Sequence, residues 1–157
     1  MVSGSFGPAQ LLLVIILIGA VIVINVFYLL NLQNTLKQVH SSRRLVPPSN
    51  VWLMFIPIFS VIYAFILYPK ISDSVKAEYQ ARQLNPDGDF ARSLGLTMAA
   101  LSVAGFLPYI GTLAGLANFV IFIIFWVKMS GYKNHLINNP QSGEGGFSIS
   151  NSDLLDN

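Results

Sequence analysis

The sequence contains no cysteine and little charge. None of its 157 residues is cysteine, and 10% are Asp, Glu, Lys or Arg, against about a quarter in a typical soluble domain. The absence of cysteine excludes disulfides, thiolate nucleophiles, iron–sulfur clusters and thiolate zinc sites. The net charge is only +2 and the longest basic run is Arg43-Arg44. Nucleic-acid binding, which needs a basic surface stripe, is therefore not expected.

Motifs for catalysis are missing as well. The chain has no phosphate-binding loop, no HExxH pair and no GxSxG turn, the signatures of nucleotide, zinc and serine chemistry. The interiors of its long apolar segments contain no Asp, Glu, Lys, Arg or His, the residue types that form proton relays inside membranes. We therefore expect neither an enzyme nor a proton-coupled transporter, and we assign no catalytic, cofactor-binding or metal-binding residues.

Long apolar runs dominate what is present. A helix needs about 20 apolar residues, and at least about 17, to cross a hydrocarbon core of roughly 30 Å. Four segments approach this length, so the sequence predicts an all-α integral membrane protein with four transmembrane helices. They cover residues 9–30, 51–68, 94–109 and 112–129. Pro108 and Gly111 separate the last two segments, which predicts a tight helical hairpin.

The first segment is longer than the core of a signal peptide and follows no Lys or Arg, which favours a membrane helix. Leu32, Leu36 and Val39 then continue a helical 3–4 spacing, so we expect the helix to extend toward residue 40. These three residues are candidate contacts to a partner, or they pack on the protein's own loops. In the following loop, residues 41–50, Arg43 and Arg44 are candidate contacts to lipid headgroups.

The second segment contains Pro57, which either kinks a spanning helix or marks a segment that re-enters the membrane. Pro69 is expected to end it. Residues 70–84 then predict an amphipathic helix on the membrane surface. Its apolar face, made by Ile71, Val75 and Tyr79, is a second candidate partner contact. Residues 85–93 are rich in turn-forming types and predict a turn.

Small residues recur four apart in the predicted hairpin. Such pairs let helices approach closely in lipid, either within the chain or in a homo-oligomer. The candidate packing residues are Gly95, Ala99, Ala100, Ala104, Gly111 and Gly115. Outside the helices, residues 1–8 form a short N-terminal segment, and the composition of residues 131–157 predicts a polar, disordered tail.

The distribution of basic residues sets the expected orientation. With four crossings, six of the nine Lys and Arg lie on the side that holds both termini and three lie on the opposite side. The positive-inside rule then places both termini in the cytoplasm. If residues 51–68 re-enter instead, all nine gather on one side and the N-terminus moves to the other. Both arrangements leave the C-terminus in the cytoplasm. We adopt four crossings as the prediction.

A pattern in residues 47–79 is similar to one in a known group of proteins. A proline-led loop precedes a Trp-Leu…Ile-Pro segment beginning at Trp52, and an I-x-x-S-x-x-x-E helix follows at Ile71, Ser74 and Glu78. The pattern resembles that of small multi-spanning bacterial inner-membrane proteins with no established activity. The resemblance implies this architecture and a bacterial inner membrane, and it implies no catalytic function.

These observations lead to three functional hypotheses. The first is a non-enzymatic accessory or scaffold subunit of a larger inner-membrane complex, with lipids and other integral membrane proteins as partners. The second is a small oligomeric channel or carrier. The third is a lipid-binding or membrane-shaping protein. The second hypothesis requires a polar path, for which the candidates are Asn25, Ser102, Thr112 and Asn118.

Overall fold

The computed structural model describes residues 7–85 and 88–140, and its regular elements in these ranges are all helical. Three helices are long and apolar enough to cross a membrane, namely α1, α2 and α4. The elements are α1 (Pro8–Lys37), η1 (Ser41–Arg43), η2 (Pro48–Phe55), α2 (Pro57–Ala81), α3 (Arg92–Ala104) and α4 (Gly111–Asn138). The predicted all-α class and the general character of a membrane protein are therefore confirmed.

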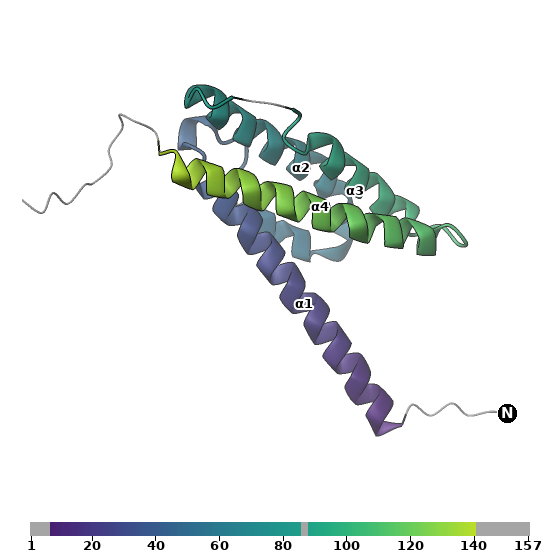
Figure 1. Ribbon diagram of the computed structural model, residues 1–157. Coiled ribbons are helices and arrows are strands. Elements are labelled where there is room, and N and C mark those ends of the chain that lie inside the picture. Colours follow the sequence, from purple (N-terminus) through teal and green to yellow (C-terminus); the bar gives the residue numbers. More distant parts are fainter. Residues whose placement is uncertain (1–6, 86–87, 141–157) are drawn as a thin grey trace, which may run out of the picture.

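The helices form a bundle from which half of α1 projects. α2, α3 and α4 lie side by side, and the C-terminal part of α1 packs against α4 and η2 (Figure 1). Residues 8–25 of α1 are exposed on every side of the helix. A helix that is apolar all round suits a lipid environment. The core of the bundle is apolar and centres on Leu32, Leu67, Tyr68, Phe125 and Met129.

The second apolar segment differs from the prediction at both of its prolines. Residues 48–55 form the 3₁₀ helix η2, and Pro57 begins α2 instead of kinking it. Proline suits the first position of a helix because its missing N–H has no partner there. α2 then continues through Pro69 to Ala81. The predicted surface helix at residues 70–84 is thus largely the second half of α2. Buried Tyr68 and Ile71 on either side of Pro69 offset the lost backbone hydrogen bond.

The predicted hairpin arms also have different lengths. α3 ends at Ala104, so the connection to α4 spans residues 105–110 and the third apolar helix is too short to count among the candidate spans. α4 continues to Asn138, which makes part of the predicted tail helical. Residues 141–157 of that tail, and residues 86–87 of the predicted turn, lie outside the described residues.

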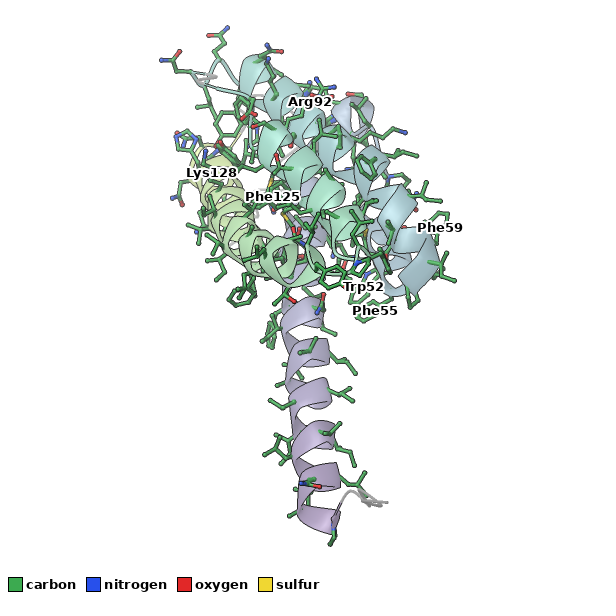
Figure 2. All side chains as sticks on the ribbon, turned by 90° about the vertical axis from the view of Figure 1, so that its right-hand side faces the viewer. Trp52, Phe55, Phe59, Arg92, Phe125 and Lys128 are labelled. Carbon is green, nitrogen blue, oxygen red and sulfur yellow. The ribbon has the colours of Figure 1, made fainter. Side chains whose placement is uncertain are left out.

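All nine Lys and Arg lie toward one end of the bundle. They belong to the second halves of α1, α2 and α4, the 38–47 loop, the residue that follows α2 and the start of α3. We call this end the charged end. Arg92 and Lys128 lie toward it in Figure 2, whereas Trp52, Phe55 and Phe59 lie toward the other end. Arg43 Nε lies 2.8 Å from Glu78 Oε2. Four crossings would place these two residues on opposite sides of a hydrocarbon core of roughly 30 Å, so the prediction of four crossings is not confirmed.

Gly95 lets α3 approach α2. A Cβ added at Gly95 would lie 2.5 Å from Tyr68 Cβ and 3.2 Å from Phe125 Cε2. Because the first of these atoms is fixed to the α2 backbone, Gly95→Ala should push the helices apart and lower the free energy of unfolding by about 1–3 kcal/mol. Detergent unfolding followed by tryptophan fluorescence measures the change. Gly131→Ala is the matched control, since no atom lies within 4 Å of its added Cβ. Equal stability of the two variants would contradict close α2–α3 packing.

Candidate functional site

A buried ionic cluster holds the charged end together. Glu78 is fully buried, and its two carboxylate oxygens accept hydrogen bonds from Arg43 Nε and Arg82 Nε, each at 2.8 Å. The backbone N–H of His40 donates to the same carboxylate at 2.9 Å. We call these four residues the Glu78 cluster. It ties the 40–43 loop to α2.

The Glu78 cluster also reaches the C-terminal ends of two other helices. Arg82 donates to the carbonyl of Gln38 after α1 and to the carbonyls of Leu136 and Asn139 at the end of α4, at 2.7–2.9 Å. The carbonyls at a helix C-terminus carry partial negative charge and lack partners within the helix. A single guanidinium group therefore satisfies and neutralises the converging ends of α1 and α4.

The two arginines predicted to bind lipid headgroups have partners within the chain. Arg43 pairs with Glu78. Arg44 donates to the carbonyls of Leu36 and Val39 at 2.9 and 2.8 Å, and so caps the end of α1. The geometry gives both residues a structural role.

The predicted partner contacts are buried inside the chain as well. Both apolar faces are covered by each other and by neighbouring helices, so neither is available to a partner in this structure. Two packed clusters contain these side chains, which are Leu32, Leu36 and Ile71 in one and Val39, Val75 and Tyr79 in the other. The helical spacing of these apolar residues therefore marks faces that pack in the protein core.

Some of the predicted packing residues are buried against other parts of the chain, and others are exposed or half-buried. Gly95 and Ala99 are buried between helices, and Gly111 lies against the Gly105 carbonyl in the hairpin turn. Ala100 is exposed and Ala104 is half-buried. Gly115 is exposed, and no atom lies within 4 Å of an added Cβ.

A cavity lies where α1 crosses the other helices, in the apolar half of the bundle. It consists of two adjacent hollows that share Val21, Asn25, Asn118 and Phe122. The smaller, of about 320 Å³, lies between α1 and α4. The larger, of about 360 Å³, is also walled by η2, α2 and α3. We call both together the crossing cavity. Volumes of this order are typical of small-molecule sites.

The larger hollow contains polar side chains among apolar ones. Asn118 Nδ2 donates to Ser102 Oγ at 3.3 Å, while Asn118 Oδ1 is buried and meets no partner among the described residues. Tyr28 is 3% exposed. Its hydroxyl lies near the hydroxyl of Tyr68, which is a weak hydrogen-bond partner, and it makes no well-aligned hydrogen bond within the described part of the chain. Unsatisfied buried polar groups are costly and uncommon.

The depth of these groups follows from the helix rise. Ser102 lies ten residues after Arg92, and Asn118 lies ten residues before Lys128. At 1.5 Å per residue, each is about 15 Å along its helix from the nearest cation. This is half the thickness of a hydrocarbon core. The polar groups of the crossing cavity thus lie at a mid-membrane depth if the charged end faces water.

The sequence identified part of this site. Asn25, Ser102 and Asn118, three of the four candidates for a polar path, all line the larger hollow. Thr112 does not, because it lies at the hairpin turn. Tyr28 was missed, although an aromatic hydroxyl within an apolar run is a usable signal. No protein-family model, curated protein or solved structure matches this chain.

Proposed function

We propose that this protein is a membrane-embedded binding protein that holds a lipophilic molecule in the crossing cavity. The observation that carries the proposal is the cavity itself, where apolar walls surround Asn118 Oδ1, which lacks a partner, and the Tyr28 hydroxyl, which makes no well-aligned hydrogen bond. In a lipid environment water does not readily satisfy such atoms, and each costs free energy. A bound molecule with its own polar group would supply the missing hydrogen bonds.

We further propose an orientation for this binding protein. The charged end faces the cytoplasm of a bacterial inner membrane, in keeping with the positive-inside rule. α1 then crosses the membrane with its N-terminus outside, while the η2–α2 and α3–α4 pairs enter and leave from the cytoplasmic side. The described C-terminal end of α4 is cytoplasmic in this arrangement. The crossing cavity opens toward lipid between α1 and α4.

A cavity-blocking variant tests the binding function. Gly115 lines the smaller hollow, and an added Cβ meets no atom within 4 Å, so Gly115→Leu should fill the space without distorting α4. The tagged protein is purified from its native membrane in mild detergent, and bound molecules are identified by native mass spectrometry and organic extraction. We expect a lipophilic molecule on the unaltered protein and at least a tenfold lower occupancy on the variant.

Gly131→Leu is the control for this experiment. Gly131 is also an exposed position of α4 with open space around it, but it does not line the crossing cavity. Its occupancy should equal that of the unaltered protein. A protein that carries no molecule beyond bulk lipid, or equal occupancy in both leucine variants, contradicts the proposal.

A second candidate function is that of an accessory subunit in a larger inner-membrane complex. One observation favours it: residues 8–20 of α1, which precede the crossing cavity, stand apart from the rest of the bundle and are exposed on all sides (Figure 2), and lipid or the helix of another protein can cover them. The same native mass spectra show whether lipid or another protein covers this part of α1. A stoichiometric foreign chain that is lost on charge substitution in α1 supports the subunit. A homo-oligomer points instead to the channel or carrier hypothesis.

A further inference from the structure

We infer that the molecule held in the crossing cavity has an uncharged head that carries a hydroxyl group, with an apolar tail that leaves between α1 and α4. This inference rests on the proposed binding function and narrows its ligand class. It follows from the hydrogen-bonding capacity, the lack of charge and the depth of the site.

The two polar groups in the larger hollow call for a ligand group that both donates and accepts. Asn118 Oδ1 is an acceptor only, and the Tyr28 hydroxyl is able to donate or accept. A ligand hydroxyl can donate to Asn118 Oδ1 and accept from Tyr28 Oη. Asn118 lacks one partner whichever way its amide is turned. Ser102 Oγ binds one end of the amide and donates its own hydrogen to the Met98 carbonyl at 2.8 Å, so the other end is unpaired in either case.

The surroundings disfavour a charged head. Among the described residues that line the two hollows, none is Asp, Glu, Lys, Arg or His. An uncompensated charge in such a place costs far more than a neutral polar group. The polar atoms lie about 15 Å along their helices from Arg92 and Lys128, so neither of these cations reaches a phosphate bound beside the polar atoms. Phospholipids are therefore poor ligands for the larger hollow.

The smaller hollow provides a path for the tail. Its walls are apolar apart from Asn25 and Asn118, and they include Val21, Gly115 and Phe119. It adjoins the larger hollow through the shared residues and lies between α1 and α4, where the two helices diverge (Figure 1). An alkyl or isoprenoid chain can thus pass from the polar atoms into the surrounding lipid while its head stays bound.

A pair of photoreactive probes tests the inference on the full chain in lipid nanodiscs. The probes are hexadecanol and palmitate, each with a diazirine on the alkyl chain, and they differ only in the head. Hexadecanol should label α1 and α4 peptides saturably and be displaced by unlabelled hexadecanol. Asn118→Leu should weaken its apparent affinity about tenfold, the equivalent of one hydrogen bond to a buried partner. Tyr28→Phe should weaken it several-fold, and Thr112→Val should leave it unchanged.

Thermal stability separates a ligand role of Asn118 from a structural one. Replacing a partly unsatisfied amide by a side chain of similar shape is nearly neutral or stabilising, so Asn118→Leu should unfold at the same or a higher temperature while it binds hexadecanol less well. Saturable labelling by palmitate at equal affinity overturns the neutral head but leaves the binding function standing. Labelling of Asn118→Leu equal to that of the unaltered chain also overturns the inference. Absence of saturable labelling by both probes counts against the binding function itself.

Discussion

Replacing Glu78 by glutamine is expected to lower the free energy of unfolding by about 3–5 kcal/mol, the usual cost of removing one partner from a buried ion pair. The substitution keeps the shape of the side chain and removes its charge. Glu78 is fully buried, and the side chains of Arg43 and Arg82 are 25% and 11% exposed. Arg43 and Arg82 would then lose a charged partner at a largely buried site.

A second ion pair in the same protein provides the control. Asp73 and Arg92 approach to 3.8 Å, but their side chains are 39% and 53% exposed. Exposed pairs contribute at most about 1 kcal/mol, so Asp73→Asn should have a small effect. Denaturant unfolding in mild detergent, followed by the fluorescence of Trp52 and Trp126, compares the two variants. If Glu78→Gln is as mild as Asp73→Asn, the Glu78 cluster is solvated and does not hold the charged end.

Sequence patterns predicted the class of this fold because membrane helices have a simple physical signature. Long uncharged runs indicated helices in lipid, and the structure contains three of suitable length. The prolines were misinterpreted, because their effect depends on surroundings that a local pattern does not report. Pro57 costs nothing at the first position of α2, and Pro69 is tolerated where its neighbours are buried.

The candidate contacts show a related limit. The spacing of Leu32 and Leu36, and of Ile71 and Val75, correctly indicated apolar helix faces. It did not indicate what covers them, and in the structure they cover one another. In the same way, the sequence offered Asn25, Ser102 and Asn118 as polar groups in apolar helices, but only the crossing of α1 and α4 brings them to one cavity.

The proposed orientation can be tested by labelling single cysteines. The sequence has no cysteine, so an introduced cysteine is the sole thiol in the protein. Single cysteines are placed at Ala9, Ser41 and Gln80, three exposed positions in α1, η1 and α2. A membrane-impermeant thiol reagent is applied to intact cells and, separately, to lysed cells. We expect labelling at residue 9 in intact cells and labelling at residues 41 and 80 only after lysis.

The comparison of residues 41 and 80 is decisive for the fold. Four crossings place them on opposite faces of the membrane, with residue 80 on the side of residue 9, whereas the 2.8 Å contact between Arg43 and Glu78 places them on one face. The expected difference is nearly all-or-none, since an impermeant reagent does not cross roughly 30 Å of hydrocarbon. Labelling of residue 41 alone in intact cells would support four crossings with both termini in the cytoplasm. Labelling of residues 41 and 80 without residue 9 would show that the orientation is the reverse of the proposed one. The predicted result leaves α1 as the crossing helix and makes the two other helix pairs re-entrant, with the crossing cavity between them and α1.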